Sequence, residues 1–116
     1  MPEAKEAAAA IAEYVQRGNN INYTCAEGAE YMQVIPLAGR IAVALEKILP
    51  GGTGTITLQG AFRLPAATDV EFALGAQVYW DKTGCNVTGT ADGNIPAGYV
   101  IEAKTAAGTS AVVRIG

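Results

Sequence analysis

The feature that most constrains the fold is a series of short β-prone runs that begins near residue 14 and continues to the end of the chain. Clusters of Gly, Pro, Asn and Thr separate the runs, and such clusters are typical of turns. About eight or nine short strands at this spacing predict an all-β sandwich or a small barrel. Because 116 residues suffice for one domain of ordinary size, we expect residues 13–116 to form a single β domain.

The clearest predicted strands lie in the second half of the chain. Residues 77–80 form its most β-prone run, and residues 81–84 supply a turn. We therefore expect residues 86–90 to return as the second strand of a hairpin. Residues 99–103 and 110–115 predict a last pair of strands.

The first half contains further strand patterns of unequal clarity. Residues 21–24 and 55–59 alternate apolar and polar side chains, which is the period of a half-buried strand. Residues 61–64 continue past Gly60, where we expect a bulge or a bend.

Three other runs in the first half are less regular. Residues 14–16 are β-prone and precede a turn cluster, and residues 31–35 stop at Pro36. Residues 40–45 alternate less cleanly, so that a helix running on to Leu49 competes with a strand. We favour the strand.

Residues 1–12 differ in composition from the rest of the chain. They are rich in Ala, Glu and Lys, which favour a helix. Pro2 is compatible with the start of a helix, because an N–H at the first helical position has no partner within the helix. The alanine run at 7–10 gives no apolar stripe, and an isolated helix of this length is marginal in water. We expect an N-terminal arm, either a short helix or a tail, that a neighbouring subunit fixes. Its mixed charges are unlike a secretory signal peptide.

The low content of charge indicates that the protein associates with other subunits. Charged residues make up 16% of the chain and hydrophobic residues 50%, with a net charge of -3, whereas an ordinary soluble domain has about 25% charged residues. Some apolar surface is therefore expected between subunits, because obligate interfaces resemble a domain core cut in half. We predict a homo-oligomer, and a compact monomer with many buried alanines is the alternative.

The residue types that carry catalysis are scarce. The chain has no His and a single serine, Ser110, which lies in a predicted strand without a nucleophile elbow. Cys25 and Cys85 have no basic partner nearby, and we expect free, buried thiols, with a disulfide as the alternative. Asp69 and Glu71 are the only close acidic pair, too few ligands for calcium. We predict no enzyme activity, no metal and no cofactor.

Nucleic acid, a nucleotide phosphate and a membrane are all disfavoured as binding partners. The eight basic residues are dispersed and the pI is near 4.8, which argues against nucleic-acid binding. The glycine-rich run at 51–54 lacks the lysine of a phosphate loop and precedes a strand. No run of about 18 apolar residues is present to cross a membrane.

Aromatic side chains are the candidates for an interface. Tyr79 and Trp80 point to opposite faces of their predicted strand, so at least one belongs to the core, and the core is the favoured place for Trp80. Tyr and Trp are common at interface hot spots. The candidate interface residues are therefore Tyr79, Trp80, Tyr99 and Phe62.

An ordered series of short motifs runs through about residues 13–116: YVQRG at 14–18, INYT at 21–24, GAFRLP at 60–65, GAQVYWD at 75–81, GCNVT at 84–88 and GYVIEA at 98–103. In this series the chain resembles the DUF2190 family of tailed-phage and prophage proteins. Residues 1–12 have no counterpart in its shorter members, and the region at 38–49 is less typical.

The resemblance implies a bacteriophage capsid cement, or decoration, protein. Such a protein is a small β domain that attaches to the outside of the head and stabilises the shell by symmetric contacts, without chemistry. Its expected partners are further copies of itself, a trimer being preferred to a dimer, and the major capsid protein. It would be made in the cytoplasm of the bacterial host and end on the virion. A virion-displayed module that binds the host or a glycan is the alternative function.

Overall fold

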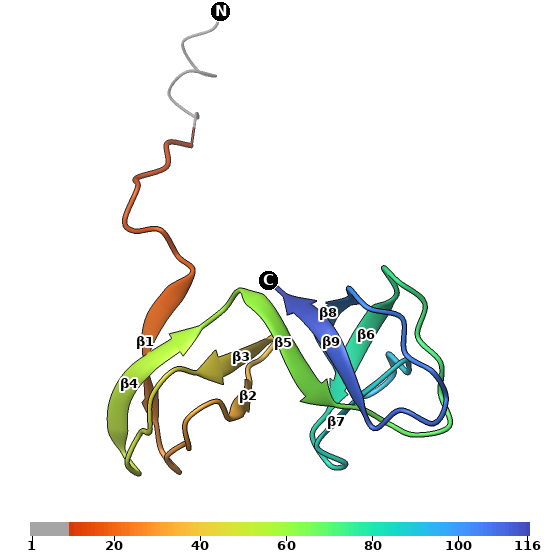
Figure 1. Ribbon diagram of the computed structural model, residues 1–116. Coiled ribbons are helices and arrows are strands. Elements are labelled where there is room, and N and C mark those ends of the chain that lie inside the picture. Colours follow the sequence, from red (N-terminus) through yellow and green to blue (C-terminus); the bar gives the residue numbers. More distant parts are fainter. Residues whose placement is uncertain (1–9) are drawn as a thin grey trace, which may run out of the picture.

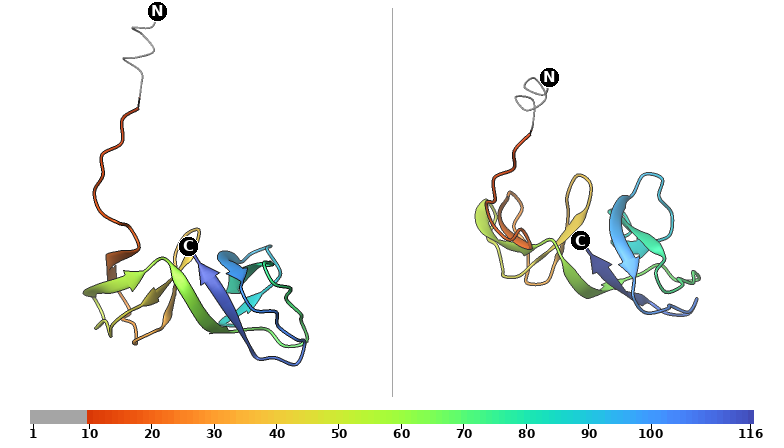
Figure 2. Two further views of the ribbon diagram at one scale, coloured as in Figure 1. Left: turned by 45° about the horizontal axis from the view of Figure 1, so that its top comes forward. Right: turned by 90° about the horizontal axis from the view of Figure 1, so that it is seen from above.

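The computed structural model describes residues 10–116, which contain strands and no helix. The strands form two antiparallel sheets that lie side by side (Figures 1 and 2). They are β1 (Asn20–Cys25), β2 (Val34–Pro36), β3 (Ile41–Ala44), β4 (Gly52–Thr57), β5 (Gly60–Pro65), β6 (Gln77–Asp81), β7 (Asn86–Thr88), β8 (Ile95–Val100) and β9 (Ser110–Ile115).

The N-terminal sheet has the strand order β1-β4-β3-β2. β1 pairs with β4 along its whole length, from Asn20 opposite Thr57 to Cys25 opposite Gly52. The loops that follow β1 and β3 fold over one face of this sheet, where Ala29 and Ile48 exchange two backbone hydrogen bonds of 2.8 Å. A small apolar core forms beneath these loops, around the fully buried Ile56.

The C-terminal sheet has the order β5-β9-β8-β6-β7 and curls until its two ends meet. Just past the end of β5, Ala66 forms a parallel bridge with Val87 of β7, and the Ala67 N–H donates to the Val87 carbonyl at 2.9 Å. The sheet is thus a small barrel around the larger core, which contains Trp80.

β3 joins the two cores because both of its faces are buried. Ile41 and Val43 point into the barrel core, whereas Ala42 and Ala44 belong to the core of the N-terminal sheet. A strand covered on both faces loses the apolar-polar alternation of a half-buried strand. This explains why the sequence of residues 40–45 was compatible with a helix as well as with a strand. The predicted strand is confirmed as β3.

The all-β prediction is confirmed, and so is the hairpin of residues 77–80 with 86–90, which is the pair β6 and β7. β8 begins at Ile95, earlier than predicted, and ends at Val100. Residues 14–16 form no strand, and residues 10–12 form no helix. The remainder of the predicted N-terminal helix lies outside the described residues.

The first part of β8 escaped prediction because it contains two residues that strands disfavour, Pro96 and Gly98. Its pairing with β6 shifts register between Val78 and Tyr79. Gly98 has φ 139°, and a Cβ atom there would collide with the carbonyl oxygen of Arg114 on β9. Only glycine permits this close approach of the two strands.

Candidate interaction surface

The structure separates the four aromatic residues that the sequence singled out. Trp80 is 5% exposed in the barrel core, and Phe62 packs against the same core. Tyr79 is half-buried, and Tyr99 is exposed beside Gln77 and Arg114 of the adjacent strands. Of the four, only Tyr99 is exposed, Tyr79 and Phe62 are half-buried, and Trp80 is buried.

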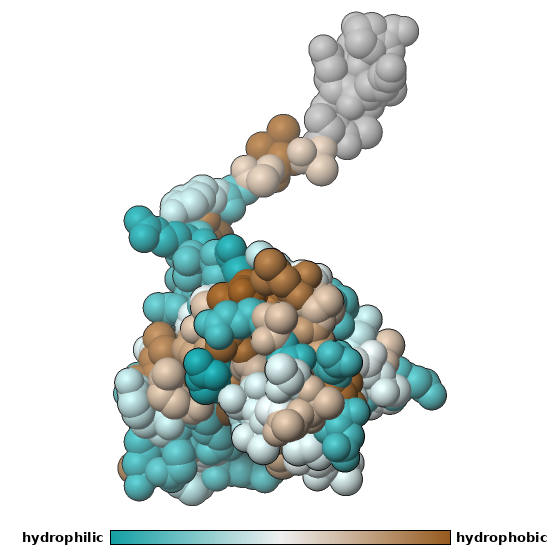
Figure 3. All heavy atoms as spheres, turned by 45° about the vertical axis from the view of Figure 1, so that its right-hand side comes forward, coloured by the Kyte–Doolittle hydropathy of each residue, from teal (hydrophilic) through white to brown (hydrophobic). Residues whose placement is uncertain are grey.

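Sequence reasoning missed an exposed leucine in the loop that joins β5 to β6. Leu74 is 70% exposed and lies three residues before β6 begins at Gln77. The loop is held against the end of β8, because the N–H of Gly75 donates to the Val100 carbonyl at 2.7 Å and the N–H of Val100 to Ala76 at 3.0 Å. We call Leu74 and Tyr99 the Leu74 patch. Figure 3 shows apolar surface gathered at the top of this side of the molecule.

The loop that carries Leu74 is fixed from within by a buried lysine. Lys104 is buried, and its Nζ donates to the carbonyl oxygens of Val70 at 2.6 Å and Thr105 at 3.0 Å. The same ammonium group lies 5.6 Å from the centre of the Phe72 ring. Because these contacts are made within one chain, Leu74 is presented on a preorganised loop.

A second group of exposed apolar side chains lies at the far end of the N-terminal sheet. Tyr31, Met32, Leu45 and Leu49 are all exposed there. Met32 has φ 67° and donates its N–H to the Ala44 carbonyl at 2.8 Å. The sequence placed Tyr31 and Met32 in a strand, but they form the turn before β2.

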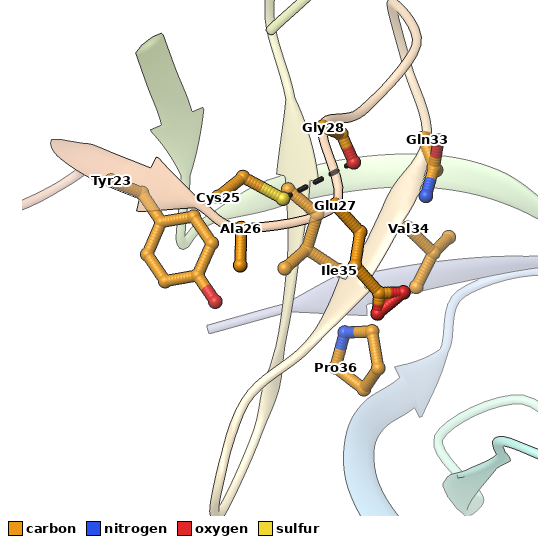
Figure 4. Close-up of a pocket in the computed structure, with 9 residues that line it drawn as sticks. All are labelled: Tyr23, Cys25, Ala26, Glu27, Gly28, Gln33, Val34, Ile35 and Pro36. Carbon is orange, nitrogen blue, oxygen red and sulfur yellow. Dashed lines mark hydrogen bonds between the residues drawn. The ribbon is translucent and has the colours of Figure 1, made fainter. Parts of the chain in front are cut away.

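A shallow hollow of about 340 Å³ opens beside this group, between the end of β1 and β2 (Figure 4). Its lining mixes apolar side chains with Glu27 and Gln33. The Cys25 thiol donates to the Gly28 carbonyl at 3.2 Å. Tyr23 lines the hollow, whereas Tyr79, Trp80 and Tyr99 do not.

Cys25 and Cys85 are both free thiols, as predicted. Cys25 is half-buried, but Cys85 is exposed, so the expectation that both are buried is wrong. Cys85 ends the tight turn between β6 and β7, with φ 55°, and a side chain at a hairpin tip has no core to enter.

The segment before β1 is the most exposed apolar part of the described chain. From here on, the arm means residues 10–18, which comprise the described end of the predicted N-terminal arm and the residues that join it to β1. It runs away from the sheets (Figure 1), and its side chains Ile11, Tyr14 and Val15 are 87%, 82% and 81% exposed. No backbone hydrogen bond joins the arm to the described remainder of the chain.

The outer edge of β1 is open on the side away from β4. Leu58 donates its N–H to the Asn19 carbonyl at 2.7 Å, so the alternation of an antiparallel ladder directs the odd residues of β1 towards β4. The N–H and C=O groups of Asn20, Asn22 and Thr24 therefore point outwards. Among residues 10–116, no strand pairs with them.

The acidic and thiol side chains of the described residues lie apart from one another. No three His, Cys, Asp or Glu side chains gather within residues 10–116 at distances suited to a metal ion. Asp69 and Glu71 are exposed on the loop before β6. In the same part of the chain, no helix is long and apolar enough to span a membrane.

The comparisons with known proteins give one match. A family model described as phage cement protein matches residues 15–115. No curated protein and no solved structure matches the chain. The matched range begins inside the arm and includes every strand of both sheets.

Proposed function

The chain belongs to the phage cement protein family, and we propose that it binds the outer surface of a bacteriophage head as a homo-oligomer. In this proposal, a trimer is preferred to a dimer, and the oligomer stabilises the shell through symmetric contacts with the major capsid protein. The family match over residues 15–115 carries the proposal. The protein would be made in the bacterial cytoplasm and act on the virion as a structural component rather than an enzyme.

A cement of this kind needs many small contacts and no chemistry. Each copy contributes a modest binding free energy, but copies linked in an oligomer raise one another's effective concentration at neighbouring shell sites, which increases the overall avidity by about 10²–10⁴. Exposed apolar side chains at several places on one small domain suit such multivalent attachment.

We assign the contact with the shell to the Leu74 patch. Leu74 and Tyr99 offer apolar and aromatic area, and Tyr is enriched at interface hot spots. The loop is anchored by Lys104 and by the hydrogen bonds of Gly75 and Val100, so little conformational entropy is lost on binding. Tyr79, half-buried on β6, is a second candidate for this contact.

The alternative, a module that binds a glycan or a host receptor, has less support. A glycan site calls for aromatic side chains grouped around a hollow. In residues 10–116, Trp80 is buried, and Tyr79 and Tyr99 do not line the hollow between β1 and β2. An exposed apolar patch together with a buried Trp80 fits attachment to another protein surface better.

Sedimentation with undecorated heads of the phage or prophage that encodes the chain tests this proposal. The wild-type protein should pellet with the heads in a saturable manner. Leu74→Asp should weaken binding about 30-fold, which corresponds to about 2 kcal/mol for an interface hot spot. Leu49→Asp is the matched control, because Leu49 is similarly exposed at the far end of the N-terminal sheet.

The possible outcomes of this experiment are distinct. If the wild-type protein does not pellet with heads, the cement proposal fails. If it pellets and the two Asp variants bind equally well, the Leu74 patch is not the contact. Genes for a head protease and a major capsid protein beside the gene for this chain would support the proposal independently.

A further inference from the structure

We infer that the arm of one copy pairs with the open edge of β1 in a neighbouring copy, as an added antiparallel strand. This inference rests on the homo-oligomer part of the proposed function and is independent of binding to the shell. It joins two features that a single chain leaves unpartnered among residues 10–116: the arm and the outer edge of β1.

β1 lacks the devices that usually protect a sheet edge. Natural edges are short, bulged, charged or interrupted by proline, because an open edge invites another strand. β2, the opposite edge of the same sheet, has three residues and ends at Pro36. β1 has six residues, NINYTC, with no charge, no proline and no break in its register with β4.

The other sheet confirms that open edges are avoided elsewhere in the described chain. Its two ends meet where Ala67 donates to Val87, and its outer strand β5 carries Arg63 and Pro65. The edge of β1 is thus the long edge without protection. An edge of this kind is consistent with a strand that pairs with another chain.

The arm has the composition of the missing strand. Residues 14–16 are β-prone, and Ile11, Tyr14 and Val15 are almost fully exposed. In an extended strand, Ile11, Glu13 and Val15 share one face, and Ala12, Tyr14 and Gln16 share the other. Binding would therefore bury apolar side chains and satisfy backbone groups at the same time.

The outward groups of β1 restrict the register of the added strand. Antiparallel pairing with Tyr14 opposite Asn22 places Val15 opposite Ile21 and Ile11 opposite Cys25. Ile21 and Cys25 are half-buried on the face that packs against the core of the N-terminal sheet. Ile11 and Val15 therefore extend that apolar face at its two ends, and Glu13 lies between them, opposite Tyr23, whose hydroxyl gives this position a polar neighbour. A shift by two residues towards the C-terminus places Arg17 opposite Ile21, and the opposite shift places Glu13 there.

The course of the arm favours exchange between copies over folding back. It runs away from its own sheets (Figure 1) and makes no backbone hydrogen bond to the described remainder of the chain, although a turn at Gly18 would let it reach its own β1 in the same register. Gly18, with φ 83°, lies at the junction and allows the arm to turn towards a neighbour. Reciprocal exchange gives a dimer, and the same contact passed from copy to copy round a ring gives a trimer.

Disulfide trapping tests the register in the full chain. In a Cys85→Ser background, Ile11→Cys should form a disulfide with Cys25 on mild oxidation, since opposite residues in a non-hydrogen-bonded pair lie close enough for one. Ala12→Cys is the matched control, because its side chain points to the other face. Mixing ¹⁴N- and ¹⁵N-labelled protein should give cross-linked peptides of mixed isotope.

Several results would overturn the inference. They are equal cross-linking of the Ile11→Cys and Ala12→Cys proteins, no cross-link in either, or cross-links confined to one isotope, which would mean that the arm binds its own chain.

As a second measurement, Asn22→Pro removes an outward N–H and should reduce the mass in light scattering to that of a monomer, whereas Asn22→Val should not. Unchanged far-ultraviolet circular dichroism, which reports both sheets, would show that both variants are folded, and an oligomer that survives Asn22→Pro would contradict the inference. None of these experiments uses phage heads, so their failure is distinguishable from failure of the shell-binding proposal.

Discussion

The backbone N–H of Ala67 donates to the carbonyl oxygen of Val87 at 2.9 Å, and this bond joins the two ends of the five-stranded sheet. The barrel is closed at that point, whereas the four-stranded sheet keeps an open edge at β1. One small chain thus combines a closed barrel with a sheet that can accept a strand. The proposed pairing of the arm with β1 follows from that contrast.

Amide hydrogen exchange should report the contrast directly. The amide of Ala67 should exchange slowly at every protein concentration, because its hydrogen bond closes the barrel. The outward amide of Asn22 should exchange rapidly in dilute monomer and slowly where the oligomer forms. Rapid exchange of Asn22 under conditions that give the oligomer would argue against pairing at β1.

Gly98 should tolerate no side chain. Gly98→Ala places a Cβ atom against the carbonyl oxygen of Arg114 at φ 139°, and we expect a loss of about 3 kcal/mol in the free energy of unfolding. Urea titration followed by Trp80 fluorescence measures the loss. Gly39→Ala is the control, because a Cβ there has open space and its φ is not positive. Equal stability of the two variants would contradict the close approach of β8 and β9.

Lys104 should stabilise the fold although it carries a buried charge. Lys104→Met keeps most of the side-chain volume but leaves the carbonyl oxygens of Val70 and Thr105 without their donor. We expect a loss of about 1–3 kcal/mol in the free energy of unfolding. Lys82→Met, at an exposed position of the β6–β7 turn, should change it by less than about 0.5 kcal/mol. Thermal unfolding by circular dichroism compares them, and a stable Lys104→Met protein would show that the loop needs no such anchor.

The two sheets should unfold together, because Ile41 of the N-terminal sheet is buried in the barrel core. Ile41→Ala should cost about 2–5 kcal/mol. It should lower the urea midpoint equally for Trp80 fluorescence, which reports the barrel, and for far-ultraviolet circular dichroism, which reports both sheets. Separate midpoints for the two signals would mean that β3 does not couple the cores.

The sequence predicted those elements whose physical signal is local. The hairpin of β6 and β7 follows from a β-prone run, a turn cluster and a second run, and each signal lies within a few residues. β3 was ambiguous because burial on both faces removes alternation, and that burial depends on a barrel distant in sequence. The strand predicted at residues 99–103 captured only the end of β8. Its start was missed because Pro96 and Gly98 have low strand propensity, and Gly98 is required there by the close approach to Arg114 on β9, which is distant in sequence.

The interaction surface was less predictable than the fold for a related reason. Trp80 was placed in the core by the alternation of its strand, and Tyr99 is exposed. Leu74 had no sequence signal, since a single leucine beside a glycine in a loop is unremarkable until hydrogen bonds to Val100 fix its position. The β-prone residues 14–16 are strand-like in sequence but have no partner within the described chain. Their strand propensity is consistent with a partner in another copy.

The most direct test of the account is the temperature at which phage heads rupture and release DNA, measured by dye fluorescence with and without the bound protein. Cement function predicts that heads lacking the protein rupture at a lower temperature, and that adding the wild-type chain raises this temperature until the binding sites are saturated. Heads that bind the protein to saturation and still rupture at the unchanged temperature would contradict it.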